Sequence, residues 1–281
     1  MELIRSACGA RPIIMGVLNV TPDSFSDGGQ HFTTVEAVAH GQAMAAMGAA
    51  VIDVGGESTR PGAVRVDAHT ECARVLPVLE GLSAAGVTTS IDTMRADVAR
   101  AAVAAGARMV NDVSGGLADP AMLDTVAELC VPIVLMHWRG FSENMNALAH
   151  YDDVVDEVRT ELADRIHAAR AAGIAADAIV IDPGVGFAKE AEHNWQVLTH
   201  LEAFSTLGFP LLVGASRKRF LGAALADNAG APRPAAERDA GTAALSVLCA
   251  QAGAWGLRVH DVRTTSDALT VLTRWQEYQH G

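Results

Sequence analysis

An alternation that repeats eight times constrains this chain more than any other feature of its sequence. Short runs rich in β-branched and apolar residues, bounded by Gly, Asp or Asn, are each followed by an alanine-rich stretch with helical spacing. Because the short runs are apolar on both faces, they are typical of strands buried in a parallel sheet. The predicted strands are 13–19, 50–55, 88–92, 109–112, 132–137, 179–182, 210–214 and 257–260.

The stretches between these strands predict helices and, with the chain length, the architecture. Amphipathic segments lie at 35–47, 96–105, 152–172 and 240–250, each with a glycine close to its end, as at many helix C-termini. Eight strand–helix units in 281 residues close most simply into an α/β (β/α)8 TIM barrel, with an open doubly wound sheet as the alternative. No linker divides the chain, so we expect a single domain over 1–281. The stretch 227–238 is expected to be a surface loop after the seventh strand.

Charge and cysteine content exclude several classes of protein. The formal net charge of −12 argues against general nucleic-acid binding, because phosphate backbones need a basic face. No apolar run approaches the roughly 18 residues of a membrane span, and the N-terminus lacks the regions of a signal peptide. The four cysteines show neither zinc spacing nor a disulfide framework. We therefore expect a reduced, cytoplasmic protein with no nucleic-acid or membrane partner.

Polar side chains accumulate where the predicted strands end. In a barrel of parallel strands the active site is built from the loops that follow the strands. In MGVLNVTPDSFSDGG (15–29) an apolar strand ends at Asn19 and passes into a loop that contains Asp23, Asp27 and a Gly-Gly pair. Because glycine permits unusual backbone angles, we expect this loop to move and to close over a ligand. The other strands end in Gly55-Gly56-Glu57, Asp92, Asn111-Asp112, His137, Asp182, Ser216-Arg217-Lys218 and Arg258-Val259-His260.

Seven motifs at these strand ends resemble, in order, those of one known family. They are MGVLNVTPDSFSDGG (15–29), VIDVGGESTRPGA (51–63), IDTMRADV (91–98), VNDVSGG (110–116), IDPGVGFAK (181–189), GASRKRFLG (214–222) and RVHDV (258–262). Over nearly its whole length the chain is similar to the dihydropteroate synthases, which are pterin-binding TIM-barrel enzymes. The resemblance implies a transferase of folate biosynthesis that joins (7,8-dihydropterin-6-yl)methyl diphosphate to 4-aminobenzoate and releases diphosphate. It also implies Mg²⁺ as cofactor, a homodimer and membership of the target class of sulfonamides.

The residue types at the strand ends suit a pterin. A pterin presents an amino group beside a ring N–H, and a carboxylate can accept both hydrogen bonds. Asp182, with the amide of Asn111, suits this edge, although an Asp before proline also starts turns readily. The resemblance implies that Lys218 points inward to bind the pterin carbonyl. It also assigns Asp92 to the pterin, although Asp92 or Thr93 could instead cap the helix that follows.

Two residues of the last strand suit the leaving diphosphate. Arg258 and His260 are two positions apart, so they share a face of the strand and can bind one anion together. The segment VRTTSD (262–267) is expected to begin the last helix, whose free N–H groups would add partial positive charge nearby. Asn19 resembles the family's magnesium ligand, and a single neutral oxygen agrees with an ion held mainly by phosphate and water.

The loops and the aminobenzoate slot are assigned by resemblance. Thr59 resembles a position that contacts the substrate diphosphate, and Arg60 resembles a residue that meets Asp27 when the first two loops close. Such a cover would exclude water from a reactive intermediate. Phe187 and the helix start near Lys218 and Arg219 would line the aminobenzoate slot, with one apolar and one cationic wall.

The expected reaction is a dissociative substitution with no protein nucleophile. The chain has no G-x-S-x-G motif, and no cysteine lies in a strand-end motif. His137 is more typical of a satisfied barrel-wall residue and is left out of the site. One alternative is a pterin-binding methyltransferase domain, which does not need TPDSFSDGG, GGESTRPG or SRKRF, all present here. The other is a non-catalytic pterin-binding paralogue, which would have lost Asp182, Lys218, Arg258 or the loop residues, and this chain keeps all of them.

Overall fold

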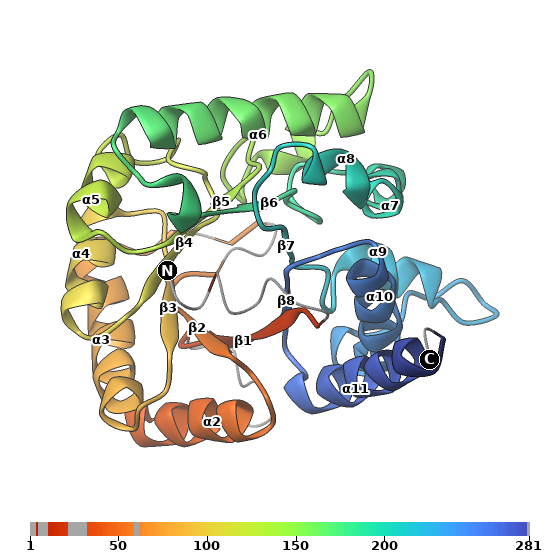
Figure 1. Cartoon of the computed structure of the whole chain (residues 1–281), viewed down its shortest axis with the longest axis horizontal. Helices are drawn as coiled ribbons and strands as arrows, with labels where there is room; N and C mark the ends of the chain where they lie inside the picture. Colours follow the sequence, from red (N-terminus) through yellow and green to blue (C-terminus); the bar gives the residue numbers. More distant parts are fainter. Residues whose placement is uncertain (1–3, 5–10, 22–32, 59–61, 64, 280–281) are drawn as a thin grey trace.

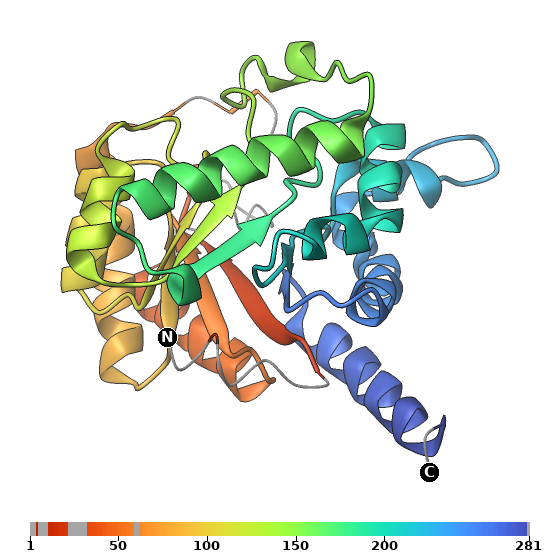
Figure 2. The same cartoon turned by 45° about the horizontal axis from the view of Figure 1, so that its top comes forward.

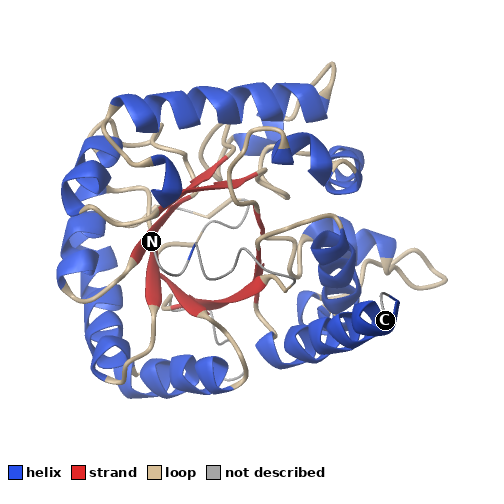
Figure 3. Ribbon diagram, viewed as in Figure 1, coloured by secondary structure: helices blue, strands red, loops and turns tan. Residues whose placement is uncertain are grey.

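A ring of parallel strands surrounded by helices forms the fold (Figures 1 and 3). The computed structural model of the chain describes residue 4 and residues 11–21, 33–58, 62–63 and 65–279. Within these residues, strands and helices alternate as the sequence predicts, and the expected (β/α)8 TIM barrel is confirmed. Figure 2 shows neighbouring strands of the ring running in the same direction.

The element boundaries lie close to those expected. The strands are β1 Ile13–Asn19, β2 Val51–Gly55, β3 Thr89–Asp92, β4 Met109–Asp112, β5 Ile133–Met136, β6 Ile179–Asp182, β7 Leu212–Val213 and β8 Gly256–Val259. The helices are α2 Thr34–Ala46, α3 Ala68–Ala84, α4 Ala96–Ala104, α5 Met122–Leu129, α6 Val154–Ala171, α7 Ala191–Thr199, α8 Leu201–Ser205, α9 Arg219–Ala224, α10 Asp239–Gln251 and α11 Val262–Gln279. Short 3-10 helices are η1 Met145–Leu148, η2 Ala176–Ala178 and η3 Ala235–Glu237.

The barrel closes weakly at one seam. The hydrogen-bonded order of strands is β6-β5-β4-β3-β2-β1-β8-β7. Between β6 and β7, the connection is a single bridge from Ile181 to Leu211 and a 2.9 Å hydrogen bond from Ile181 N to Pro210 O. The expected strand at 210–214 is therefore too long, because β7 has only two residues. Pro210 has no N–H, so it cannot extend the ladder as a donor.

The barrel interior changes from apolar to polar along the strands. Near the strand starts, Met15, Val51, Met109, Val134, Val180 and Leu212 pack in one interior cluster. The alternate strand residues belong to the larger core between sheet and helices. Side chains two positions apart on a strand share a face, so Asp53, Asn111 and Asp182 follow the interior residues of β2, β4 and β6 toward the carboxyl ends. The fold thereby gathers polar groups at one end of an apolar interior.

The start of α4 differs from the expectation for Asp92 and Thr93. The helix begins at Ala96, and its N–H donates to Asp119 Oδ2 at 2.8 Å, a cap from the following loop. Thr93 Oγ1 accepts from Arg95 N at 3.2 Å, before the helix begins. Asp92 is therefore not a capping residue, which leaves its carboxylate for contacts inside the barrel.

The remaining expectations about the helices and loops can be placed on the structure. The segment 227–238 is a mostly exposed loop, as expected, but it follows α9 rather than β7 directly and contains η3. The last helix begins within 262–267 as predicted. Among the described residues, no helix combines the length and the apolar character that a bilayer crossing requires.

Candidate active site at the carboxyl end of the barrel

The buried carboxylate of Asp53 connects β2 to side chains of β3, β4 and β8 inside the barrel. Asp53 lies on β2 and is fully buried. Its Oδ2 accepts from Asn111 Nδ2 at 2.9 Å and from Arg258 Nε at 2.6 Å. The hydroxyl of Ser90 donates to Oδ1. Because the Asn111 amide nitrogen is bound to Asp53, the amide oxygen is the end that remains to accept hydrogen bonds from a ligand.

Arg258 joins this group to Asp92. Its Nη2 donates to Asp92 Oδ2 at 2.7 Å, so the guanidinium bridges two carboxylates from β2 and β3. Burial raises the pKa of Asp92 to about 7, while the charge of Arg258 opposes the rise. Arg258 remains partly exposed, with 19% of its side chain accessible. The structure therefore brings Asp92, Asn111 and Arg258 together, with Asp53 bound to Asn111 and Arg258, and Arg258 bound to Asp92.

Asp182 ends β6 at the start of a tight turn. Its Oδ1 accepts from Gly184 N at 2.8 Å, so the carboxylate does start a turn, as the alternative interpretation held. The two roles are compatible, because this bond occupies only one of the two carboxylate oxygens. Burial raises the pKa of Asp182 to about 6, against the lowering effects of the Gly184 hydrogen bond and the positive charges of Lys218 and Arg258.

Lys218 lies beside this turn and faces inward, as expected. Its ammonium is 4.1 Å from the centroid of the Phe187 ring, a cation–π contact. Burial lowers the pKa of Lys218 to about 8, and the charge of Arg258 adds to this effect. Phe187 itself is buried among Met94, Val113, Met136 and Met145.

Arg219 lies apart from this pair. It is the exposed first residue of α9. Burial lowers the pKa of Arg238, and the charge of Arg219 adds to this effect. The described contacts therefore bring Phe187 and Lys218 together but do not bring Arg219 to them.

His260 and Arg258 lie at the end of β8 but have different partners. The Ser216 hydroxyl lies 3.0 Å from His260 Nδ1, and it accepts from His260 N at 3.2 Å. The first turn of α11 is capped by Asp261, whose Oδ1 accepts from Thr264 N at 3.0 Å. The carboxylate of Asp261 thus occupies part of the helix terminus that the sequence suggested for an anion.

Asn19 and Asp92 face the same space above Gly55. A Cβ on Gly55 would lie 3.4 Å from Asn19 Oδ1 and 3.6 Å from Asp92 Oδ2. In the described part of the chain, no group of three His, Cys, Asp or Glu side chains has a geometry suited to a metal ion. A single amide oxygen fits Mg²⁺ only as an ion coordinated mostly by phosphate oxygens and water.

Four residues that the sequence analysis names in the first two loops lie outside the described residues. These are Asp23, Asp27, Thr59 and Arg60. The structure describes the base of the second loop, where the partly exposed Arg65 and Arg95 both bind Glu57, with Nε–Oε1 and Nη1–Oε2 distances of 3.1 and 2.9 Å. Glu57 also accepts from Val66 N at 3.1 Å. This carboxylate anchors the chain on the far side of the loop to the end of β2.

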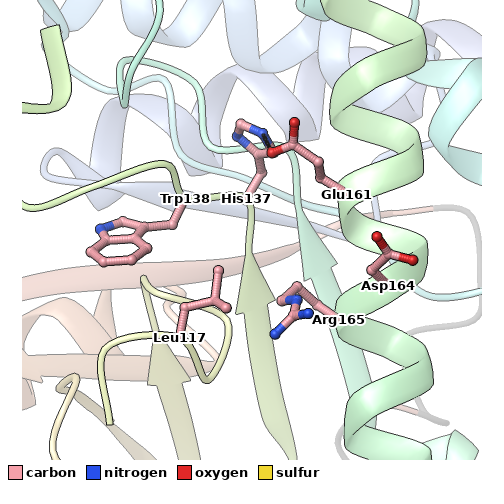
Figure 4. Close-up of a pocket in the computed structure, with 6 residues that line it drawn as sticks. All are labelled: Leu117, His137, Trp138, Glu161, Asp164 and Arg165. Atoms are coloured by element: carbon pink, nitrogen blue, oxygen red, sulfur yellow. Dashed lines mark hydrogen bonds and ion pairs between the residues drawn. The ribbon is translucent and has the colours of Figure 1, made fainter. Parts of the chain in front are cut away.

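His137 has the wall position expected of it. Burial lowers its pKa to about 4, with a further lowering from the charge of Lys189. The ring is therefore neutral near pH 7, with Nε2 2.9 Å from Glu161 Oε2 and Nδ1 2.9 Å from Lys189 Nζ. Figure 4 shows Glu161 reaching from α6 toward His137. A cavity of about 130 Å³ lies beside them, lined by Leu117, His137, Trp138, Glu161, Asp164 and Arg165.

Sequence reasoning missed two buried residues that this site depends on, Asp53 and Lys189. Both lie within the quoted motifs 51–63 and 181–189. A charge between apolar residues of a predicted buried strand was the available signal for Asp53, because an unpaired buried carboxylate is costly. The signal for Lys189 was weaker, since a lysine that follows a turn is usually exposed.

Comparisons with known proteins agree with this geometry. Residues 15–260 match the family described as pterin binding enzyme. The dihydropteroate synthase of Mycobacterium leprae is 56% identical over 93% of each chain. A structure of Xanthomonas albilineans dihydropteroate synthase with 4-aminobenzoic acid has a TM-score of 0.87 and 50% identity, over 96% of this chain and 93% of that one. Another, in complex with 7,8-dihydropteroate, has a TM-score of 0.84 and 48% identity, over 96% and 94%. The chain belongs to the dihydropteroate synthase family of pterin-binding enzymes.

Proposed function

We propose that this chain joins (7,8-dihydropterin-6-yl)methyl diphosphate to 4-aminobenzoate, giving 7,8-dihydropteroate and diphosphate. The observation that carries the proposal is the convergence of Asp182, Asn111, Lys218 and Arg258 at the carboxyl end of a barrel with an apolar floor. The related X. albilineans enzyme, whose structures contain 4-aminobenzoic acid and 7,8-dihydropteroate, supports the same chemistry here.

The pterin ring is held by groups with complementary hydrogen-bonding roles. Asp182 keeps one carboxylate oxygen clear of the Gly184 bond, and this oxygen accepts from the amino and ring N–H edge of the pterin. The Asn111 amide, oriented by Asp53, presents its oxygen to a neighbouring N–H. Lys218 donates to the pterin carbonyl on the opposite side. Asp92 completes the pterin site next to Arg258.

The diphosphate is bound by cationic groups at the end of β8. Arg258 is held in place by Asp53 and Asp92, so its guanidinium is oriented before the substrate arrives. Such pre-organisation lowers the cost of stabilising charge that develops on the leaving oxygens. His260 supplies a second contact, and Thr59 supplies a third from the second loop.

The substitution proceeds by departure of diphosphate before attack by the amine. The bond between the exocyclic carbon and the diphosphate oxygen breaks, and its electron pair leaves with the diphosphate. The electron-rich dihydropterin stabilises the resulting cation, which the aniline nitrogen captures, and the nitrogen then loses a proton. Asp27 and Arg60 close the first two loops over the intermediate and exclude water. Phe187 provides the apolar wall for aminobenzoate, and Arg219 supplies charge for its carboxylate after local rearrangement.

Mg²⁺ is the proposed cofactor, with Asn19 Oδ1 as its protein ligand. When bound, the ion neutralises part of the charge on the leaving diphosphate. The single amide oxygen above Gly55 fits this arrangement, because phosphate oxygens and water supply the other ligands. In calorimetric titrations, Asn19→Ala should weaken the Mg²⁺-dependent part of pyrophosphate binding and leave pyrophosphate binding without Mg²⁺ unchanged.

A turnover assay tests the proposed function. Purified protein is incubated with the pterin diphosphate, 4-aminobenzoate and Mg²⁺, and dihydropteroate and diphosphate are quantified. The expected result is equimolar formation of both products only when both substrates are present. If the folded protein binds pterin but forms no product, it is a non-catalytic paralogue. Methyl transfer from a methylated pterin to added cobalamin would identify the methyltransferase alternative.

We also propose that the protein forms a homodimer through α10 and α11. The large apolar residues Val271, Trp275 and Tyr278 lie on one face of α11 and are 69%, 63% and 87% exposed, and Leu248 on the adjacent α10 is 60% exposed. Figure 2 shows α11 extending outward from the barrel. Light scattering should give the mass of a dimer for the wild type and of a monomer for Trp275→Glu.

The cytoplasm is the proposed location, because the described cysteines are free thiols. Cys72, Cys130 and Cys249 form no disulfide. Free thiols are typical of proteins kept in a reducing compartment. Fractionation of the source cells, with the protein detected by antibody, would test this assignment.

A further inference from the structure

Lys189 is a buried lysine that the proposed reaction does not use. Its side chain follows the turn after β6 and is 7% exposed. The Nζ atom lies 2.9 Å from His137 Nδ1 and donates to Gly184 O at 3.1 Å and Phe187 O at 3.3 Å. An ammonium group has three N–H donors, and these three partners account for all of them. No donor remains for a substrate, so Lys189 does not act as a catalytic residue.

The partners of Lys189 lie on two elements that border the site. His137 follows β5 and is held from the other side by Glu161 of α6 (Figure 4). Gly184 and Phe187 belong to the turn that connects Asp182 to α7. The turn N–H groups are also held, with Gly184 N bound to Asp182 and Gly186 N bound to Asn194 Oδ1 at 2.6 Å. Lys189 thus fixes the turn carbonyls against the end of β5.

The same turn carries the contact surface for Lys218. The Phe187 ring faces the Lys218 ammonium at 4.1 Å. A Cβ added at Gly186 would approach Lys218 Cδ to 2.8 Å, so this part of the turn lies directly against the lysine stem. A shift of the turn backbone would therefore move Phe187 and remove the surface on which Lys218 rests.

We propose that Lys189 is a positioning residue that holds the turn of residues 184–187, and through it sets the places of Phe187 and Lys218 in the active site. This inference rests on the proposed function for its consequence in catalysis, but the positioning itself can be measured without substrate. Burial lowers the pKa of Lys189 to about 7, with an opposing effect from Asp182, which agrees with a position enclosed by protein on all sides.

The composition of the chain offers a direct spectroscopic test. Lys189 and Lys218 are its only lysines. Protein grown with ¹³C-lysine should therefore give two Cε–H signals. The Lys218 signal should be displaced upfield, because its side chain lies over the Phe187 ring. Phe187→Leu removes the ring and identifies this signal.

In unliganded Lys189→Met, the remaining Lys218 signal should move toward the position of a solvent-exposed lysine. Glu161→Gln is the matched control, because it alters the other side of His137 but leaves the bonds from Lys189 to the turn carbonyls. Its Lys218 signal should keep the wild-type position. A folded Lys189→Met variant with an unmoved Lys218 signal would overturn the proposal.

Ligand binding then connects the position of the turn to the reaction. Lys189→Met should weaken aminobenzoate binding, measured with pyrophosphate and Mg²⁺ present, by roughly tenfold, because a displaced Phe187 no longer supplies the apolar wall of the slot. If Lys189→Met loses the upfield shift of the Lys218 signal but keeps its aminobenzoate affinity, the positioning role is upheld. That result would contradict the assignment of Phe187 and Lys218 to the aminobenzoate slot. Should Lys189→Met not fold, Lys189→Gln is measured in the same way. Failure of both variants to fold would show that Lys189 supports the barrel rather than the turn, and would also overturn the proposal.

Discussion

At the residue scale, Asp53 determines how Asn111 and Arg258 are presented to a ligand. A buried carboxylate is costly unless it is paired and hydrogen-bonded, and Asp53 meets this condition through Ser90, Asn111 and Arg258. The pairing fixes the amide of Asn111 with its oxygen available and holds the Arg258 guanidinium in a defined plane. With the roles proposed for Asn111 and Arg258, pterin recognition and diphosphate binding therefore both depend on the one carboxylate of Asp53.

Asp53→Asn should lower kcat/KM for the pterin diphosphate by about 10- to 100-fold, because hydrogen bonds to a charged group contribute roughly 1.5–3 kcal/mol. The amide oxygen can still accept from Asn111 and Arg258, but the negative charge that pairs with the guanidinium is lost, and the amide NH2 replaces the oxygen that accepts from Ser90. Ser90→Ala is the control, since it removes one hydrogen bond to Asp53 and keeps the charge. Steady-state kinetics on both variants provides the measurement. Equal kcat/KM values for the two variants would show that the charge of Asp53 is not required.

At the element scale, the turn between β6 and α7 requires glycine at position 184. Gly184 has a φ of +69°, and an added Cβ would lie 2.4 Å from the carbonyl oxygen of His137, a backbone atom that cannot move aside easily. This close approach packs the turn against the end of β5 and places the N–H of Gly184 within hydrogen-bond distance of Asp182.

Gly184→Ala should therefore destabilise the protein well beyond the roughly 1–2 kcal/mol that a left-handed conformation costs alanine, and should also weaken pterin binding. Gly208→Ala is the matched control, with a φ of +80° and no atom within 4 Å of the added Cβ. Urea unfolding of both variants gives the comparison. If Gly184→Ala lost no more stability than Gly208→Ala, the turn would have room to shift, contrary to the close packing described.

Periodicity and strand-end chemistry predicted the elements well, and the failures have local physical causes. The apolar runs of β1, β4 and β6 matched their strands because both faces of each are buried. The strand predicted at 210–214 is longer than β7, because Pro210 interrupts the ladder of hydrogen bonds. The cap of α4 comes from Asp119, and Arg258 pairs with Asp53 across 205 positions of sequence. Neither contact has a local signal, so only the fold reveals them.

At the scale of the whole molecule, the site carboxylates reduce stability at neutral pH. Burial raises the pKa of Asp182 to about 6 and that of Asp92 to about 7, above the ordinary value for aspartate. At pH values between the ordinary aspartate pKa and these raised pKa values, the two carboxylates bind more protons in the folded protein than in the unfolded chain. The stability that these groups contribute is therefore fully present at low pH and is lost as the pH rises through 6 and 7.

Between pH 4 and pH 7 the wild type should lose roughly 2 kcal/mol more unfolding free energy than Asp182→Asn, because one pKa unit corresponds to about 1.4 kcal/mol. The substituted amide does not titrate, so this part of the wild-type pH dependence would be absent from the variant. Asp124→Asn, at an exposed site on α5, should follow the wild type. Urea unfolding across this range measures the slopes, and parallel curves for Asp182→Asn and wild type would contradict the raised pKa.

Calorimetry of pterin binding to Asp182→Asn tests the central claim most directly, namely that this barrel is a pterin site anchored by Asp182. Both the pterin diphosphate and the same pterin without phosphates are titrated into wild type and variant. The account predicts that both ligands lose affinity by about tenfold or more, because the lost hydrogen bonds involve a charged acceptor that contacts the ring alone. Wild-type affinity for both ligands in a folded Asp182→Asn variant would contradict it.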